Sequence, residues 1–418
     1  MLQQEPVDIL ILSNGPGEIS TWVRPVVRNI RQKLGNDILQ LRISVVLSPC
    51  PHSTGKESAI ALSYPEVDRV LPPAEFFAFL LWGKTPNNWD WRKRGMVVFL
   101  GGDQFYTLIL GKRLGYSTLI YAEWDARWYR WLDRFAVMNQ AVIDKISAKY
   151  HHKFTVVGDL MADVSLEVKK SPVFARSLTP QIGLLVGSKP AKLYQGVPLC
   201  MAVAEKIAAK LPQAKFIIPV APTVDKQELV RYANPQHNKL IAKLGNVSGR
   251  SSDSGSKTYL ITSGGTQIEL VEQFPAYESL IQCQICLTTV GANTAELASL
   301  GIPMLVLLPT QQLDAMRSWD GLPGILANLP GIGSLFAKLI NWLIIRQKRF
   351  FAWPNIWAKQ EIVPELVGKL QPQTIADLVL DYLDKPTKLQ AMSDRLVAVR
   401  GKAGAAKQIT GSIEKALK

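Results

Sequence analysis

Short apolar segments of strand length alternate with helical segments along most of the chain. In the first half, the segments typical of buried strands are 7–12, 41–47, 96–100, 117–121, 134–138 and 154–157. In the second half they are 182–188, 214–221, 257–264, 285–290 and 304–309. Helical stretches such as 23–34, 106–114 and 197–210 lie between them. Because apolar strands separated by helices are typical of parallel sheets covered on both faces, the pattern predicts a doubly wound α/β protein.

The alternation occurs twice, which predicts two domains. A chain of 418 residues is too long for one typical core. The junction falls near residues 165–180, so we expect one α/β domain over 1–170 and a second over 171–374, facing each other across a cleft. Residues 375–418 have a helical apolar stripe and are expected to pack back on the first domain.

Charge and cysteine content narrow the class of partner and compartment. Lys and Arg number 48 against 34 Asp and Glu, a net charge of +14, which favours nucleic acid, anionic lipid headgroups or nucleotide-sugar phosphates. Four cysteines in a chain of this size indicate a reducing compartment. The first apolar stretch lacks a preceding basic segment, and no run of about 18 apolar residues occurs. We therefore expect a cytoplasmic protein.

A strand–loop–helix near residue 290 is the strongest candidate binding site. An apolar run ends before Gly291, and Asn293, Thr294 and Glu296 follow in a short helical segment. Small residues let a ligand approach the backbone, and N–H groups at the helix start favour phosphate oxygens. A carboxylate one turn into the helix can accept hydrogen bonds from a ribose diol. The segment predicts a nucleotide-diphosphate site, and an ordinary turn with a surface glutamate is the alternative.

A similar turn opens the second domain. Gly187, Ser188 and Lys189 follow a strand and supply a glycine, a hydroxyl and a cation. Lys189 is suited to neutralise a diphosphate leaving group, with a solvated surface lysine as the alternative.

Two turns of the first domain carry candidate catalytic and acceptor-binding residues. Gly15, Gly17, Glu18 and Ser20 form a glycine-containing turn that lacks the third glycine of a dinucleotide fingerprint, and Pro16 removes an N–H donor. Glu18 is equally suited to contact a sugar hydroxyl or to cap the helix.

Asp103 follows Gly101-Gly102 at the end of a strand, where catalytic acids and bases are common. A helix cap is the alternative for this carboxylate.

Two segments are more apolar than a solvated surface requires. The aromatic residues of the first are Phe76, Phe77, Phe79 and Trp82. The second spans 335–351 and mixes aromatic and basic residues, including Trp342, Arg346, Lys348, Arg349 and Phe350. This mixture is typical of a segment in an anionic lipid interface, with a core helix or a homodimer contact as the alternative. No nucleic-acid-binding module is present, so we expect no nucleic acid partner.

Several motifs resemble those of one family. Residues 354–366, PNIWAKQEIVPEL, are similar to a signature of the form PN-(two apolar)-A-x-x-E-(two apolar)-x-E-L, and residues 158–163, GDLMAD, to G-H-x-M-A-D. Residues 17–20 match the start of G-E-x-S-G-D, and residues 185–189 are similar to L-P-G-S-R. With a looser match at 293–297, the chain resembles the lipid-A-disaccharide synthases over nearly its whole length.

The resemblance implies a GT-B fold of two Rossmann-like domains, with acceptor binding in the first half and UDP-sugar binding in the second. It implies an inverting, metal-independent transfer of an N-acyl-glucosamine-type sugar to a lipid-linked acceptor, with peripheral attachment to the inner face of the cell membrane. The resemblance also gives Asp103 the place of the general base and puts Asn355, from the signature segment, with the acceptor-site and loop residues. The absence of any Asp-x-Asp agrees with a design that needs no metal or other cofactor.

The chain also departs from the family pattern. Thr21-Trp22 stand for Gly-Asp, Asp159 for His and Lys189 for Arg, and the segment 121–130 diverges. Because a Lys ammonium cannot make the bidentate hydrogen bonds of an Arg guanidinium, Lys189 would contact a phosphate differently from the Arg of the family pattern. The acceptor and the transferred sugar are therefore left open. A nucleotide-sugar epimerase of the same fold and a catalytically silent membrane-binding module are the alternatives.

Overall fold

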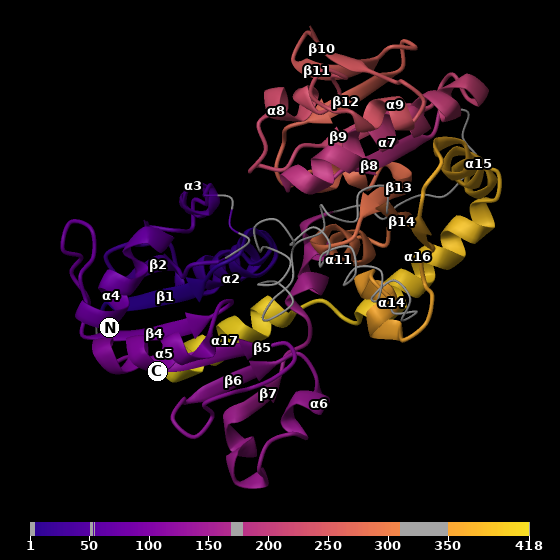
Figure 1. The fold of residues 1–418 in the computed structure, drawn as a ribbon. Coiled ribbons are helices and arrows are strands. Elements are labelled where there is room, and N and C mark those ends of the chain that lie inside the picture. Colours follow the sequence, from indigo (N-terminus) through magenta and orange to yellow (C-terminus); the bar gives the residue numbers. More distant parts are fainter. Residues whose placement is uncertain (1–4, 51–52, 54, 169–178, 310–349, 418) are drawn as a thin grey trace, which may run out of the picture. The chain divides into compact units, whose positions relative to one another are not determined.

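The computed structural model describes residues 5–50, 53, 55–168, 179–309 and 350–417. The chain forms two compact units, one of residues 1–167 with 401–418 and one of residues 168–400 (Figure 1). The chain therefore leaves the first unit after Glu167 and returns to it after Arg400.

The first unit is built on a wholly parallel sheet, as the apolar strand pattern predicted. Its strands, in spatial order, are β3 (Arg69–Leu71), β2 (Leu41–Leu47), β1 (Val7–Ser13), β4 (Arg94–Phe99), β5 (Ser117–Ala122), β6 (Arg134–Val137) and β7 (Phe154–Val156). The strand order reverses between β1 and β4. Ligands of open α/β sheets bind beyond the carboxyl ends of the strands at such a switch point.

Helices and helical turns connect these strands. They are α1 (Pro16–Glu18), the π-helical turn η1 (Ile19–Val23), α2 (Arg24–Leu34), α3 (Glu57–Leu62), η2 (Pro73–Glu75), α4 (Phe76–Trp82), α5 (Gln104–Leu114), α6 (Gln140–Ile143), η3 (Ala148–Lys153), η4 (Leu160–Glu167) and α17 (Ala405–Leu417). Aromatic and aliphatic side chains from the sheet, α4 and α5 form a buried cluster on one face. On the other side of the unit, α17 packs against α2 and lies beside β4 and β5 (Figure 1).

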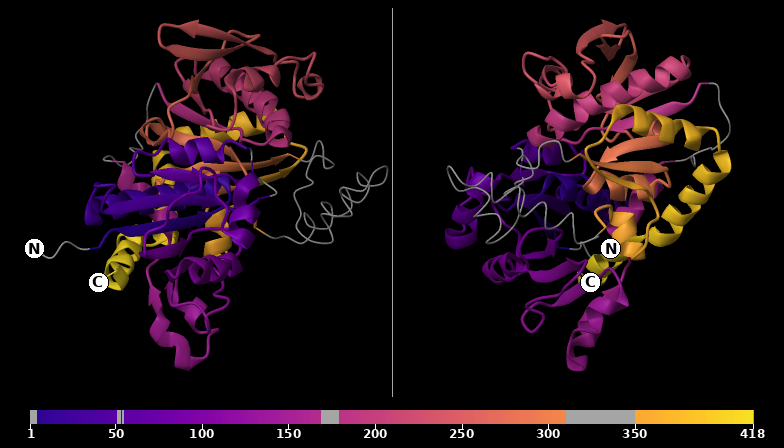
Figure 2. Two further views of the ribbon diagram at one scale, coloured as in Figure 1. Left: turned by 90° about the vertical axis from the view of Figure 1, so that its left-hand side faces the viewer. Right: turned by 45° about the vertical axis from the view of Figure 1, so that its right-hand side comes forward.

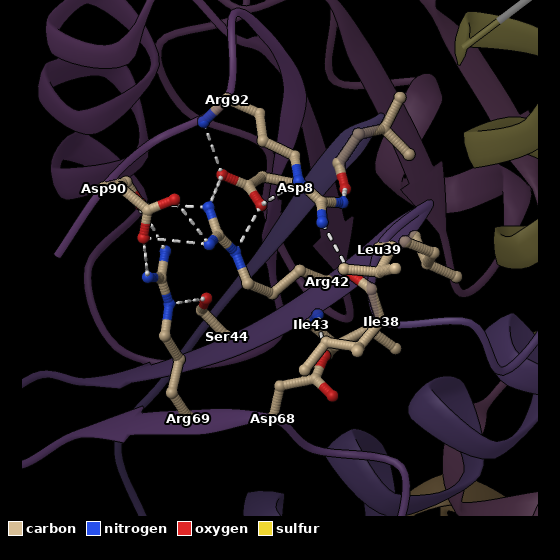
Figure 3. A network of polar contacts seen from close by, with 12 residues as sticks. Asp8, Ile38, Leu39, Arg42, Ile43, Ser44, Asp68, Arg69, Asp90 and Arg92 are labelled. Carbon is tan, nitrogen blue, oxygen red and sulfur yellow. Dashed lines mark hydrogen bonds and ion pairs between the residues drawn. The ribbon is translucent and has the colours of Figure 1, made fainter. Parts of the chain in front are cut away.

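A network of charged side chains closes the amino edge of this sheet (Figure 3). Asp8 is fully buried and accepts hydrogen bonds from Arg42 at 2.8 and 2.9 Å, from the Arg92 backbone N–H at 2.9 Å and from the Tyr116 hydroxyl at 2.9 Å. Arg42 also binds Asp90 at 2.9 Å. Burial, reinforced by the charge of Asp8, raises the pKa of Tyr116. These hydrogen bonds satisfy the buried Asp8 carboxylate and connect the starts of β1 and β2 with the segment before β4.

The second unit has a mixed sheet. Its strands, in spatial order, are β10 (Gly249–Ser254), β11 (Lys257–Thr262), β12 (Gln267–Val271), β9 (Lys215–Pro219), β8 (Gln181–Leu185), β13 (Cys283–Thr289), β14 (Met304–Pro309) and β15 (Glu365–Gly368). Pairing is parallel from β12 to β15 and antiparallel at β10–β11 and β11–β12. The hairpin lies at the top of both views in Figure 2. The strand β10 of this hairpin is not among the strands predicted from the sequence.

The helices of the second unit are α7 (Pro190–Lys210), α8 (Lys226–Arg231), α9 (Leu240–Lys243), α10 (Tyr277–Leu280), α11 (Ala292–Ser299), α14 (Trp353–Ala358), α15 (Pro372–Leu383) and α16 (Pro386–Arg400). Of the segment 375–418, α17 packs on the first unit, whereas α15 packs on α7, and α16 on α11 and α14. Among the described residues, no helix is both long and apolar enough to cross a bilayer.

The return of the chain to the first unit depends on one carboxylate. Asp163 in η4 is buried and accepts hydrogen bonds from the backbone N–H groups of Gly404, Ala405 and Ala406 at 2.5, 3.2 and 2.7 Å. These groups open α17, so Asp163 satisfies helix-start donors that would otherwise have no partner.

Replacing Asp163 with Ala should therefore destabilise the first unit. The change leaves three N–H groups without an acceptor, and we expect a loss of about 2–4 kcal/mol in the free energy of unfolding, measured by urea denaturation. Asp37→Ala is the control, because the exposed Asp37 side chain accepts one hydrogen bond, from the Leu39 N–H at 2.9 Å. Equal losses in the two variants would contradict this role of Asp163.

Candidate functional site

Turns after β1, β2 and β4 meet at the carboxyl edge of the first sheet. A β-carbon at Gly101 would lie 3.1 Å from Asn14 Oδ1 and 3.2 Å from Ser13 Oγ. A β-carbon at Gly102, where φ is 99°, would lie 2.7 Å from Ser48 Oγ. The β4 turn therefore needs glycine to pass so close to the polar ends of β1 and β2.

This edge presents polar atoms whose hydrogen bonding is incomplete. Within the described part of the chain, the buried Ser13 Oγ and Asn14 Oδ1 have no hydrogen-bond partner. Ser48 is buried and its hydroxyl reaches only the Ser13 carbonyl, at 3.5 Å. Buried polar atoms without partners are uncommon in folded proteins and are often satisfied by a ligand or water. The edge is thus suited to a ligand with hydroxyl groups.

The β1 turn brings Glu18 to the same place. Its carboxylate lies where a side chain on Gly15 would have to be, and its Cγ is 3.3 Å from the β-carbon position of Gly101. The chain continues as the π-helical turn η1, a form that is frequent at functional sites. Within it, the Ser20 hydroxyl hydrogen-bonds with Tyr64, whose pKa burial raises to about 12. The structure therefore brings Gly15 and Glu18 together with Gly101 at this edge.

Asp103 begins α5 and remains accessible. Its carboxylate accepts a hydrogen bond from the Phe105 N–H at 2.9 Å, which is the helix-cap arrangement considered from the sequence. The side chain is nonetheless half-exposed and lies 3.9 Å from Arg127. An N-cap carboxylate is fixed in direction by the helix start, so the cap orients Asp103 and leaves its exposed side open to a ligand.

In the second unit, Lys192 lies between two glycine turns. A β-carbon at Gly187 would be 2.9 Å from Lys192 Cδ, and one at Gly291 would be 2.9 Å from Lys192 Nζ. The ammonium group donates to the Val290 carbonyl at 2.6 Å. The turns after β8 and β13 thus converge on one cation, which sequence analysis missed in favour of Lys189. The sequence did contain a signal for Lys192, because this residue lies in the first turn of the helix that follows the Gly187 turn.

The surroundings of Lys192 are suited to an anion. Burial, with a smaller contribution from the charge of Lys189, lowers its pKa to about 8. A lysine with few neighbouring counter-charges is stabilised when a ligand brings negative charge. Thr289 Oγ1 lies 3.2 Å from the β-carbon position of Gly187 and is buried with no hydrogen-bond partner among the described residues. Ser188 and Lys189 are partly exposed at the start of α7.

The residues predicted in α11 differ in their surroundings. Thr294 is buried, donates to the Gly291 carbonyl at 2.8 Å and accepts from the Trp353 N–H at 3.2 Å, so its hydroxyl shapes the turn. Asn293 is partly exposed. Glu296 accepts a hydrogen bond from the Tyr277 hydroxyl at 3.4 Å, and burial raises its pKa to about 7. Glu296 is therefore partly protonated near neutral pH.

The predicted ligand-side role of Asn355 is wrong. This side chain is fully buried. It donates to the Val363 carbonyl and to Glu365, both at 2.8 Å, and accepts from the N–H groups of Ile362 and Val363. Glu365 in turn accepts from the N–H groups of Phe351 and Ala352. Asn355 and Glu365 of the signature therefore hold a loop together, and the burial and hydrogen bonds of Asn355 leave it no surface for a ligand.

The predicted membrane contacts divide into three groups. Phe76 and Phe79 are fully buried in the core of the first unit, which corrects their assignment because an enclosed ring cannot reach a bilayer. Phe77 and Trp82 on the same helix are exposed. Phe350 is partly exposed, whereas Trp342, Arg346, Lys348 and Arg349 lie outside the described residues.

Comparisons with known proteins confirm the resemblance drawn from the motifs. The chain is 22% identical to the lipid-A-disaccharide synthase of Nitrosococcus oceani over 230 residues, 55% of this chain and 46% of that protein. It is 22% identical to that of Myxococcus xanthus over 239 residues, 57% of this chain and 49% of that protein. A shorter match of 90 residues to the Anaeromyxobacter sp. synthase is 34% identical and covers 21% and 23% of the two chains. The chain thus spans about half the length of these relatives or less, and no family model matches it.

Solved structures establish the fold. A putative UDP-N-acetylglucosamine 2-epimerase from Listeria monocytogenes matches with a TM-score of 0.53 at 12% identity, covering 98% of this chain and 96% of that one. The UDP-GlcNAc 2-epimerase from Neisseria meningitidis matches with a TM-score of 0.53 at 16% identity, covering 98% and 100%. At identities this low the likeness shows the fold alone. The prediction of a GT-B fold with two Rossmann-like domains is confirmed.

The raised pKa of Glu296 predicts a pH-dependent stability. Between about pH 4.5 and 7 the unfolded chain releases this proton while the folded chain keeps it, so stability falls as pH rises through this range. Between pH 5 and pH 8, the free energy of unfolding of the unsubstituted protein should fall by about 2 kcal/mol relative to that of Glu296→Gln. Urea denaturation of the second unit at the two pH values measures this. Parallel pH profiles would show that Glu296 titrates normally.

Proposed function

We propose that this protein is an inverting glycosyltransferase that moves a sugar, of N-acyl-glucosamine type, from a UDP-sugar to a lipid-linked acceptor. The observation that carries the proposal is the accessible Asp103 carboxylate, fixed by its helix at the switch point of the first sheet. The same edge holds a buried hydroxyl and a buried amide oxygen that have no hydrogen-bond partner among the described residues. The sequence relatives are named lipid-A-disaccharide synthases, which favours this reaction class.

The second unit supports UDP-sugar as the donor. One structural neighbour is described as bound to UDP-GlcNAc and another, from S. aureus, as a complex with UDP. In this chain, the diphosphate would meet Lys192, the glycine turns at Gly187 and Gly291, and the N–H groups that open α7 and α11. Glu296, one turn into α11, would accept hydrogen bonds from the ribose.

In the proposed reaction, Asp103 removes the proton of the acceptor hydroxyl as its oxygen attacks the anomeric carbon of the sugar. The bond from that carbon to the diphosphate oxygen breaks, and UDP leaves with the electron pair. Attack from the opposite face inverts the anomeric centre. Lys192 and the helix starts would stabilise the negative charge on the departing diphosphate in place of a metal ion. Glu18 would orient the acceptor through its hydroxyl groups.

The lipid acceptor implies work at the inner face of the cell membrane. The exposed Phe77 and Trp82 support a peripheral contact there.

An epimerase is the second candidate, because structural neighbours named UDP-GlcNAc 2-epimerases share the fold. Incubation with UDP-GlcNAc alone separates the two, since an epimerase converts the sugar without an acceptor and a transferase does not.

Asp103→Asn should lower turnover by about two to four orders of magnitude, because an amide cannot take the proton. Binding of UDP to the second unit should be unchanged in calorimetric titration. Asp125→Asn is the matched control, since Asp125 is an exposed neighbour that also pairs with Arg127, at 3.3 Å. Turnover of Asp103→Asn equal to that of the control would remove Asp103 from the mechanism.

Lys192→Met should weaken UDP binding by about tenfold or more at pH 7 through the loss of one partly buried charge. In the unsubstituted protein, UDP affinity should fall as pH rises through about 8, where Lys192 loses its proton. The phosphates of UDP keep their charge above pH 7, so they do not cause this step. Calorimetry between pH 7 and pH 9 measures both effects.

The Lys189→Met variant tests whether the pH step in UDP affinity belongs to Lys192. Because the charge of Lys189 helps to lower the pKa of Lys192, its removal should move the step to higher pH while Lys192→Met abolishes the step. A step that persists in Lys192→Met would assign the titration to another group.

A further inference from the structure

The groups that crowd the carboxyl edge of the first sheet are oxygen atoms and a carboxylate side chain. The nearest atoms to a β-carbon at Gly101 would be Asn14 Oδ1, Ser13 Oγ and Glu18 Cγ, at 3.1, 3.2 and 3.3 Å. Ser13 is fully buried, and among the described residues its Oγ and Asn14 Oδ1 have no hydrogen-bond partner. Because an amide oxygen and a carboxylate accept hydrogen bonds and never donate them, this edge requires a ligand that brings donors.

The glycine turns of the second unit have the opposite character. A β-carbon at Gly291 would lie 2.9 Å from the Lys192 ammonium, and one at Gly187 would lie 2.9 Å from Lys192 Cδ. An ammonium group donates hydrogen bonds and carries positive charge, so it suits phosphate oxygens. The chain thus has a cation at the glycine turns of one unit and a carboxylate at those of the other.

Carboxylates also predominate in the connections that leave the carboxyl edge of the first sheet. These connections are residues 14–18, 48–56, 100–103, 123–133, 138–139 and 157–159. Their charged residues are the carboxylates Glu18, Asp103, Glu123, Asp125, Asp133 and Asp159 and the cations Lys56, Arg127 and Arg130. Arg127 is already engaged, because its guanidinium lies 3.3 Å from Asp125 and 3.9 Å from Asp103. Lys145, from beyond α6, donates to the Trp124 carbonyl at 3.1 Å. An anionic ligand would therefore meet net negative charge at this edge.

Exposed aromatic rings adjoin the same carboxylates. Arg127 lies 3.9 Å from Asp103, and the next residue, Trp128, is 37% exposed. The ring centroids of Trp128 and Phe105 are 4.8 Å apart. A sugar carries hydroxyl groups around its rim and apolar C–H groups on its faces, so aromatic rings beside oxygen atoms suit a sugar better than a compact anion.

The pattern of donors and acceptors separates a sugar from a phosphate. At neutral pH the oxygens of a phosphate are acceptors that carry negative charge, so beside Asn14 Oδ1 and Glu18 they would meet other acceptors and like charge. A sugar hydroxyl can donate to either group and can also accept from the Ser13 hydroxyl. The edge therefore favours hydroxyl groups and disfavours phosphate.

We propose that the carboxyl edge of the first sheet selects an acceptor whose headgroup is rich in hydroxyl groups and carries no phosphate. Ser13 and Asn14 hold its hydroxyl groups, and Glu18 excludes phosphate. That the ligand is the acceptor rests on the proposed function, whereas the preference for a sugar without phosphate rests on the oxygens of the edge. The donor diphosphate has a separate site at Lys192.

The probes for the test are octyl β-D-glucoside and octyl β-D-glucoside 6-phosphate, which differ by one phosphate. Calorimetric titration of the full chain without UDP-sugar measures the affinity for each. The titrations are repeated on Lys192→Met, because Lys192 would otherwise hold the phosphate of the second probe. In both proteins octyl glucoside should bind at least about tenfold more tightly than its phosphate. Equal or tighter binding of the phosphorylated probe to Lys192→Met would overturn the proposal, as would no binding of octyl glucoside below its micelle-forming concentration.

Glu18→Gln provides a readout that misfolding would not give, because this variant should gain an affinity. The amide keeps the shape of the side chain and removes its charge, so affinity for the phosphorylated probe should rise by about fivefold or more relative to that for octyl glucoside. The matched control is Glu5→Gln, which removes the same charge from an exposed residue before β1, at the opposite edge of the sheet. Equal ratios of the two affinities in the two variants would overturn the exclusion of phosphate by Glu18.

Ser13→Ala tests the hydroxyl contacts. Loss of one buried hydroxyl should weaken the binding of octyl glucoside by about fivefold. The control is Ser117→Ala at the start of β5, where the hydroxyl makes one long hydrogen bond, to the Gly95 carbonyl at 3.5 Å. Circular dichroism verifies that both variants are folded, and equal affinities would overturn the role of Ser13. Failure of the unsubstituted protein to bind UDP would overturn the proposed function, whereas loss of probe selectivity with UDP binding intact would overturn the present proposal alone.

Discussion

Parallel pairing of β1 with both β2 and β4 is the constraint on which the first unit depends. Because the three strands run the same way, the turns that leave Ser13, Leu47 and Phe99 emerge at one edge of the sheet. Glycine at 101 and 102 lets these turns crowd together, and among the described residues the buried Ser13 hydroxyl and Asn14 amide oxygen have no hydrogen-bond partner. The same geometry sends the Asp103 turn and the connection after β5 to that edge.

The two edges of the first sheet use polar groups in opposite ways. At the amino edge, Asp8 is buried and accepts from Arg42, Arg92 and Tyr116, so removing any one donor would leave a charge short of partners. At the carboxyl edge, oxygen atoms are left unsatisfied and Asp103 is half-exposed. Polar satisfaction at one edge stabilises the sheet, and its absence at the other provides binding energy for a ligand. The second unit shows a similar contrast. The Asn355 side chain makes hydrogen bonds through both its amide nitrogen and its oxygen, whereas the buried Thr289 hydroxyl has no hydrogen-bond partner among the described residues.

The sequence predicted the strands well because buried parallel strands are apolar throughout, a pattern that needs no tertiary information. It missed β10 because an exposed edge strand of polar residues has the composition of a loop. It placed Phe76 and Phe79 at a membrane because an apolar run has no helical period that would separate the buried face from Phe77 and Trp82. Lys192 was missed because adjacency to a glycine turn favoured Lys189, whereas the convergence of two turns distant in sequence selects Lys192. Trp128 entered the sequence analysis only as part of the divergent segment 121–130, since exposure is a property of the folded chain.

Some of the residues that carry the resemblance maintain the fold, whereas several departures from the family pattern lie near the candidate site. Asp163 caps the helix that returns to the first unit, and Asn355 with Glu365 holds a loop of the second, so these motif residues maintain the fold. The departures lie where ligands are expected. Trp22 follows the turn that holds Glu18, and the divergent segment 121–130 becomes the loop that presents Trp128 beside Asp103. The resemblance to lipid-A-disaccharide synthases therefore rests in part on residues that maintain the fold, and the proposed transfer reaction depends on others. A change of acceptor would alter the carboxyl edge of the first sheet and leave Asp163, Asn355 and Glu365 in place, which is the pattern that this chain shows.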